Sequence, residues 1–126
     1  MTRLRVLIAD DNPLFAESVA SMLAEDGRFD VVARAANGQE AVALTELLDP
    51  QLVLMDVEMP VMDGLEATRR IALRASAPVI VLTSSDSTAH LVGARKAGAA
   101  GYLRKDLLEW LDLLARALAV GRSDAA

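Results

Sequence analysis

The chain has 126 residues, of which 53% are hydrophobic and 25% are charged, and its formal net charge is −5. This length and balance suit one domain with a single core and exclude a disordered tail. The acidic balance argues against a nucleic-acid-binding surface in this chain, and the absence of cysteine excludes disulfides, thiol chemistry and Cys-type zinc sites.

The N-terminal apolar run ends at two aspartates, too early for a signal peptide. Nowhere does the sequence contain about 18 consecutive apolar residues, the length needed to span a bilayer as a helix. We therefore expect a cytoplasmic protein.

The first strand is expected at residues 4–9, directly before Asp10 and Asp11. Asn12 then offers an N-cap oxygen, and Pro13 suits the first helical position, where its missing N–H is harmless. This helix is expected to end at Gly27, with an apolar face at helical spacing made of Phe15, Val19, Met22 and Leu23.

Short apolar runs and helical patterns alternate along the rest of the chain. The strands are expected at residues 4–9, 31–35, 52–55, 79–82 and 100–103. The helices are expected at residues 13–27, 40–48, 65–74, 87–97 and 107–120, with turns at residues 37–38 and 62–64. The third strand is apolar on both faces, which is typical of a parallel sheet covered by helices. Five strands alternating with five helices predict a doubly wound α/β fold with right-handed crossovers.

Polar side chains follow four of the predicted strands at the point where each strand ends. These residues are Asp10-Asp11, Asp56, Thr83-Ser84 and Lys105. Because ligands bind at the carboxyl ends of strands in open parallel sheets, we expect these groups to gather at one edge.

Each of these groups taken alone also has an ordinary structural interpretation. The aspartate pair could favour the start of a helix through its dipole, and Asp56 could be a turn residue. Thr83-Ser84 could cap the next helix, and a lone Lys105 could be a solvated charge. The combination favours function, since clustered carboxylates call for a hard divalent cation such as Mg²⁺. A carboxylate beside Mg²⁺ and a lysine can attack phosphorus and form an aspartyl phosphate.

This constellation resembles the receiver domain of bacterial two-component response regulators. The resemblance covers residues 4–120 and extends to Pro60 and to Asp63-Gly64. The run AGAAGYLRKD at residues 97–106, with Lys-Asp where most receivers have Lys-Pro, resembles the LuxR/NarL subfamily, whose members usually carry a C-terminal helix-turn-helix DNA-binding domain. The resemblance implies a (βα)5, CheY-like fold with strand order 2-1-3-4-5.

The resemblance also implies roles for matching residues. Asp56 would accept a phosphoryl group from a phosphohistidine of a sensor kinase. Mg²⁺ would be held by Asp11, Asp56 and the backbone carbonyl of Glu58, with Asp10 contributing through water. 

Thr83 would move to hydrogen-bond one phosphoryl oxygen, and Lys105 would pair with another. Tyr102 would be the aromatic switch that turns inward as Thr83 moves; a half-buried tyrosine packing the last strand is the alternative for the unphosphorylated state. Glu58 and Ser85 are candidate modulators, and the Glu58 side chain could either reach the metal or point to solvent. We expect a trans bond at Lys105-Asp106, because a non-proline cis bond costs roughly 2.5–4 kcal/mol.

Partner surfaces are less strongly marked. The last predicted helix has apolar residues around more than one face, so Trp110 could pack in the core or mark a homodimer surface through the first or last helix. His90 is expected at the surface. Residues 1–121 are expected to form the receiver domain and residues 122–126 a tail or the start of a linker, with DNA contacted only through an effector domain absent from this chain.

Two other functions fit parts of the pattern. A small phosphohydrolase of the haloacid dehalogenase type also uses an aspartate at a strand end with an acidic residue two positions later, as in Asp56-Val57-Glu58. Such an enzyme does not need Asp10-Asp11. A degenerate receiver acting only as an interaction module would not need the complete acidic set.

Overall fold

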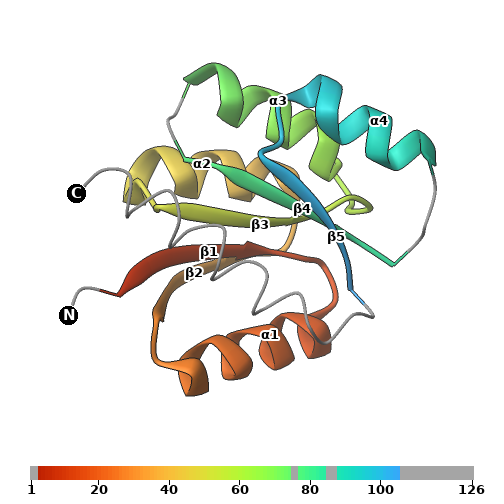
Figure 1. The fold of residues 1–126 in the computed structure, drawn as a ribbon. Helices are drawn as coiled ribbons and strands as arrows, with labels where there is room; N and C mark the ends of the chain where they lie inside the picture. The colour runs from red at the N-terminus through yellow and green to blue at the C-terminus, as the bar shows by residue number, and fades with distance from the viewer. Residues whose placement is uncertain (1–2, 75–76, 85–87, 106–126) are drawn as a thin grey trace, which may run out of the picture.

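The computed structural model describes residues 3–74, 77–84 and 88–105, in which five strands alternate with four helices (Figure 1). The strands are β1 (Leu4–Ala9), β2 (Phe29–Ala35), β3 (Leu52–Asp56), β4 (Val79–Thr83) and β5 (Gly101–Arg104). The helices are α1 (Pro13–Asp26), α2 (Gly38–Leu48), α3 (Gly64–Arg74) and α4 (Thr88–Ala97). The helix expected at residues 107–120, with Trp110, lies outside the described residues.

The strands form one parallel sheet in the order β2-β1-β3-β4-β5. Strand β1 lies between β2 and β3. The strand order therefore reverses direction at β1, and a crevice forms there between the loops that follow β1 and β3. This order confirms the predicted doubly wound α/β fold.

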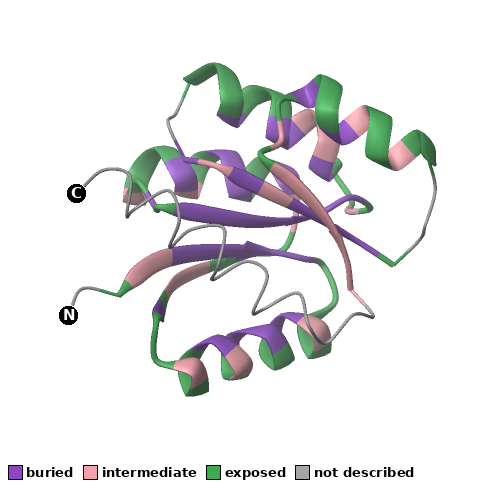
Figure 2. Cartoon of the chain, in the orientation of Figure 1, coloured by how far each residue is buried: buried purple, intermediate pink, exposed green. Residues whose placement is uncertain are grey.

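Helices cover both faces of the sheet, with α1 on one face and α2, α3 and α4 on the other (Figure 1). Alternate side chains of the central strands enter two separate cores, since successive residues of a strand point to opposite faces. Leu52 and Leu54 of β3 pack in the α1 core, whereas Val53 and Met55 pack in the other. All five residues of β3 are buried, as the unbroken purple of this strand shows (Figure 2).

Several element boundaries differ from the sequence prediction by one or two residues. Helix α2 begins two residues earlier than expected because the Asn37 side chain caps it, accepting a hydrogen bond from Glu40 N. Strand β2 begins at Phe29, because Phe29 already pairs with Leu4. Strand β5 is shifted one residue toward the C-terminus, to Gly101–Arg104. Helix α1 begins at Pro13, as predicted, and ends at Asp26, one residue before the predicted end at Gly27.

The four described helices are all too short or too polar to cross a membrane. The peptide bonds between described residues are all trans. The predicted trans bond at Lys105-Asp106 involves a residue outside this part of the chain and stays a prediction.

Candidate functional site

The carboxyl ends of β1, β3, β4 and β5 meet around an open pocket of about 640 Å³. Its walls are made by the loops and side chains that follow these strands. The lining residues are Asp10, Asp11, Asn12, Phe15, Asp56, Val57, Glu58, Met59, Pro60, Thr83, Ser84 and Lys105. The structure thus brings the polar strand-end residues into one pocket.

Asp10 is fixed by contacts to both of its carboxylate oxygens. Its Oδ1 accepts a hydrogen bond from Asn12 N at 2.8 Å, and its Oδ2 accepts one from Lys105 Nζ at 2.6 Å. Asn12 in turn caps α1, its side chain accepting from Leu14 N and Phe15 N. Capping of the helix therefore also orients the first carboxylate of the pocket.

Asp56 is the last residue of β3 and is only 7% exposed. The chain turns sharply after it, and Gly64 N donates to Val57 O at 2.8 Å. A Cβ atom on Gly64 would lie 1.8 Å from the Asp56 carbonyl oxygen. Only glycine fits at this close approach, so Gly64 helps to define where the Asp56 backbone lies.

Lys105 enters the pocket from the residue after β5. Its backbone N–H donates to Thr83 O at 2.8 Å, which ties it to the end of β4. Its Nζ lies 2.6 Å from Asp10 Oδ2 and 3.0 Å from Asp56 Oδ1, and 4.3 Å from the centroid of the Phe15 ring. The ammonium therefore bridges two carboxylates and lies over an aromatic face.

The electrostatics of the pocket are set by three carboxylates around one ammonium. Burial raises the pKa of Asp56, and the negative charges of Asp10 and Asp11 add to this rise, while the hydrogen bond from Lys105 opposes it. Burial lowers the pKa of Lys105, but its hydrogen bonds to Asp10 and Asp56 outweigh burial and leave the pKa raised. The site stabilises a cation and disfavours the charged form of Asp56.

The donor set fits a hard divalent cation. One carboxylate oxygen each from Asp10, Asp11 and Asp56 lie within 4.8 Å of one another, with Asp10 and Asp56 buried and Asp11 exposed. Mg²⁺ prefers oxygen ligands at about 2.0–2.1 Å and keeps several waters. Asp10, Asp11 and Asp56 would hold such an ion, and its charge would offset the excess of carboxylates.

Thr83 is 2% exposed at the end of β4, and its Oγ1 lies 3.4 Å from Nδ1 of His90 on α4. His90, which was expected at the surface, is only partly exposed, and this contact places its ring near the end of β4. Tyr102 is half-buried on β5, packed against the core on the α3 side of the sheet. The inward movement of Tyr102 stays a prediction.

Glu58 is exposed at the rim of the pocket, two residues beyond Asp56. Its modulating role, and the metal contact by its carbonyl, remain predictions. Ser85 lies outside the described residues.

Two contributors to the site were not recognised from the sequence. Phe15 was expected only as a core residue, yet its ring faces the Lys105 ammonium. Asn12 was expected only as a cap, yet its N–H also holds Asp10. The sequence offers one signal for the role of Phe15. It comes three residues after Asn12, about one helical turn, so it lies on the same side of α1 as this pocket residue.

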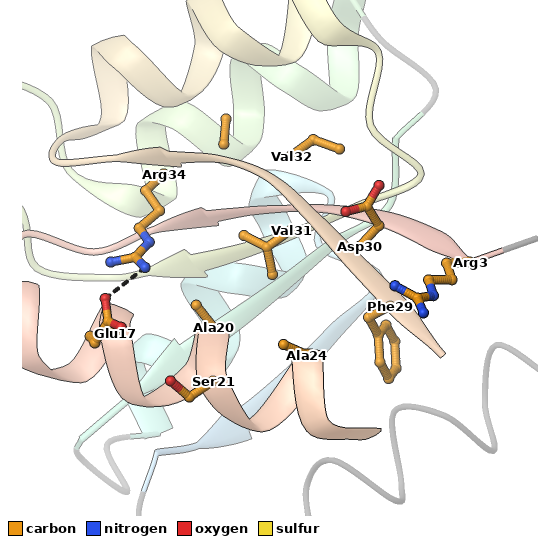
Figure 3. Close-up of a pocket in the computed structure, with 11 residues that line it drawn as sticks. Arg3, Glu17, Ala20, Ser21, Ala24, Phe29, Asp30, Val31, Val32 and Arg34 are labelled. Atoms are coloured by element: carbon orange, nitrogen blue, oxygen red, sulfur yellow. Dashed lines mark ion pairs between the residues drawn. The ribbon is translucent and has the colours of Figure 1, made fainter. Parts of the chain in front are cut away.

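A second hollow, of about 520 Å³, lies between α1 and β2 (Figure 3). Small side chains of α1 form one wall, and Arg34 Nη2 pairs with Glu17 Oε2 at 2.7 Å near one end (Figure 3). Both side chains are largely exposed, and an exposed ion pair of this kind contributes little. The strand-end pocket is therefore the better candidate for chemistry.

Known proteins share sequence with most of this chain. The family model for the response regulator receiver domain matches residues 6–117. The transcriptional regulatory protein PdtaR of Mycobacterium tuberculosis is 48% identical over 101 residues, which cover 80% of this chain and 49% of PdtaR. DegU of Brevibacillus brevis, also a transcriptional regulatory protein, is 39% identical over 83% of this chain and 45% of its own length. The chain spans about half the length of these curated relatives.

Relatives with another output also match. A protein-glutamate methylesterase/protein-glutamine glutaminase of Shewanella frigidimarina is 38% identical over 81% of this chain and 26% of its own length. The shared part therefore does not by itself specify one output.

Solved structures agree with both the fold and the family. The signal receiver domain of the response regulator NarL from Mycobacterium tuberculosis has a TM-score of 0.87 at 30% identity, covering 97% of this chain and 98% of that one. A CheY-like receiver domain from Methanospirillum hungatei has a TM-score of 0.86 at 26% identity, covering 98% and 99%. With its fold, its strand-end pocket and these matches, the chain belongs to the response regulator receiver domain family.

Proposed function

We propose that this receiver accepts a phosphoryl group on Asp56 from a phosphohistidine of a sensor kinase and changes conformation in response. One observation carries the proposal: the Asp56 carboxylate lies in a pocket with two further carboxylates, its Oδ1 3.0 Å from Lys105 Nζ. An oxygen nucleophile beside a fixed positive charge is what phosphoryl transfer requires.

In the transfer step, a carboxylate oxygen of Asp56 forms a bond to phosphorus as the bond from phosphorus to the donor nitrogen breaks. The nitrogen keeps the bonding electron pair and takes a proton from solvent. Asp56 becomes an aspartyl phosphate, and Lys105 pairs with a phosphoryl oxygen in place of a carboxylate. Burial of Asp56, which is 7% exposed, fixes the attacking oxygen in advance.

Mg²⁺ is the proposed cofactor and would supply charge neutralisation for the transferring oxygens. Asp11, Asp56 and the Glu58 carbonyl would hold it, with Asp10 contributing through water. The cluster of acidic oxygens within 4.8 Å supports this assignment.

The proposed conformational response uses Thr83 and Tyr102. The Thr83 hydroxyl donates to a phosphoryl oxygen. Tyr102, half-buried on β5 next to α4, moves inward as Thr83 does. Glu58 and Ser85 would tune the lifetime of the phosphoryl group.

The proposed output is transcriptional control from the cytoplasm, through a helix-turn-helix domain that contacts DNA. The two transcriptional regulatory relatives support this output. A homodimer through the first or last helix is a further proposal for the activated state. The receiver domain is proposed to span residues 1–121, with residues 122–126 as a tail or linker.

Intact-mass measurement with acetyl phosphate and Mg²⁺ tests the phosphoacceptor proposal. We expect wild type to gain the mass of one phosphoryl group and Asp56→Asn to gain none. Equal labelling of both would refute the acceptor assignment.

The same preparation distinguishes the two alternatives. Steady turnover of a small phosphomonoester would favour a phosphohydrolase of the haloacid dehalogenase type. A wild type that is not labelled by acetyl phosphate and does not bind beryllofluoride would favour a degenerate receiver.

A further inference from the structure

The ammonium of Lys105 has contacts of two different kinds. An ammonium carries three N–H donors. Two carboxylate oxygens lie at hydrogen-bond distance, those of Asp10 at 2.6 Å and Asp56 at 3.0 Å. On a third side lies the Phe15 ring, with its centroid 4.3 Å from Nζ, well within the range of a cation–π contact.

The carboxylate contacts and the ring contact would respond differently when a cation binds and when Asp56 is phosphorylated. Asp10 and Asp56 are also members of the acidic cluster, so a divalent cation competes with Lys105 for their oxygens. Phosphorylation further removes charge from the Asp56 oxygen that Lys105 contacts. The ring of Phe15 binds neither a metal ion nor a phosphoryl group, so its attraction for the ammonium persists.

Phe15 is also held in place. It is half-buried on the first turn of α1, it lines the pocket, and it packs against the core on the α1 side of the sheet. Lysine has a long flexible stem, whereas the ring is fixed by its helix and by this core. A fixed ring face can therefore hold a mobile ammonium at one place.

We propose that Phe15 is a positioning residue for Lys105: its ring face keeps the Lys105 ammonium in the pocket while the cation and the phosphoryl group occupy the carboxylates. This inference rests on the proposed phosphoacceptor function and adds a residue to it. Its contribution is to the rate of labelling, because an ammonium already in place does not have to be recruited during the transfer.

The first measurement is the rate of labelling by acetyl phosphate and Mg²⁺ in three variants. Phe15→Leu keeps an apolar side chain and removes the ring, and we expect labelling about 3- to 10-fold slower. Phe15→Tyr keeps the ring face, and we expect a rate within about 2-fold of wild type. Leu14→Ala, at a 79% exposed position next to Phe15, is the control and should label as wild type does.

The second measurement reads the contact directly. The chain has only two lysines, Lys96 and Lys105, so the ε-methylene NMR signals are few and Lys96, exposed on α4, is an internal reference. We expect an upfield ring-current shift of the Lys105 ε protons in wild type. It should persist with Mg²⁺ and beryllofluoride and be lost in Phe15→Leu.

Two results would overturn the inference while leaving the proposed function intact. One is a labelling rate in Phe15→Leu that equals the wild-type rate. The other is loss of the Lys105 ring-current shift when Mg²⁺ and beryllofluoride bind to wild type. If circular dichroism shows that Phe15→Leu does not fold, Phe15→Met replaces it, with the same expected slowing of labelling and loss of the ring-current shift. Absence of labelling in wild type refutes the proposed function and, with it, this inference.

Discussion

At the scale of single residues, Asp56 combines a requirement of the chemistry with a cost to the fold. Its carboxylate is buried near Asp10 and Asp11, which repel its negative charge, and the Lys105 ammonium offsets only part of that repulsion. Catalytic groups are often held in surroundings that shift their pKa in this way. The free energy of unfolding should therefore depend on the charge of this one side chain.

We predict that Asp56→Asn is more stable than wild type at neutral pH when EDTA removes divalent cations, by on the order of 1 kcal/mol. The folded-state pKa of Asp56 is raised, so the folded protein holds this proton more tightly than the unfolded chain does. The protonated form of Asp56 therefore stabilises the folded protein. This stabilisation is complete below the unfolded-state pKa of about 3.9 and is lost as pH rises through the folded-state pKa.

Urea unfolding of both proteins across this pH range measures the difference. It should shrink toward acid pH, where Asp56 is protonated in both states. Asp30→Asn, which removes the same charge from an exposed position on β2, controls for net charge. A wild type as stable as Asp56→Asn at neutral pH would contradict the raised pKa.

At the scale of elements, the pocket depends on where each strand ends and how the chain turns afterwards. The β3–α3 connection shows this dependence most clearly. Gly64 opens α3 directly against the carbonyl of Asp56, with 1.8 Å between that oxygen and the position of a Cβ atom. A side chain at this position would push the start of α3 away from the end of β3.

We predict that Gly64→Ala lowers the free energy of unfolding by about 3 kcal/mol, because the new methyl group overlaps backbone atoms that cannot move aside easily. Gly27→Ala is the matched control: Gly27 follows α1 with φ 85° and has open space around the Cβ position. It should lose only about 1 kcal/mol, the cost of a left-handed conformation for alanine. Equal losses in the two variants would show that contact with Asp56 is not the cause.

The sequence predicts elements better than it predicts their ends. The β strands and helices were recognisable because apolar runs and helical periodicity alternate, and the buried β3 was recognisable from its continuous apolar character. The start of α2 was placed too late, since Asn37-Gly38 resembles an ordinary turn until the Asn37 side chain is seen capping the helix. The Phe15–Lys105 contact joins residues 90 positions apart in sequence, and only the folded chain brings them together.

At the scale of the whole molecule, binding of a cation should act on global stability. The acidic cluster draws its oxygens from the end of β3 and from the loop between β1 and α1. These oxygens are close together only in the folded state. A ligand that binds only the folded state raises the free energy of unfolding by mass action.

We predict that Mg²⁺ stabilises wild type by about 1.4 kcal/mol at a concentration ten times its Kd. Asp11→Asn should lose most of this gain, since Asp11 is one of the three carboxylates in the cluster. Glu25→Gln removes the same charge from an exposed position on α1 and should keep the gain. Thermal unfolding with Mg²⁺, against sodium chloride of matched ionic strength, measures the three proteins. An equal response in all three would argue against a cation at this cluster.

The central claim is that Asp56, among the clustered carboxylates, is the nucleophile toward phosphorus. The most direct test labels wild type with acetyl phosphate and Mg²⁺, reduces the product with borohydride, and sequences the peptides by mass spectrometry. Borohydride converts an aspartyl phosphate to homoserine and leaves free aspartate unchanged. We predict homoserine at position 56 alone, and only when Mg²⁺ is present. Homoserine at Asp10 or Asp11 with Asp56 unchanged would contradict the account.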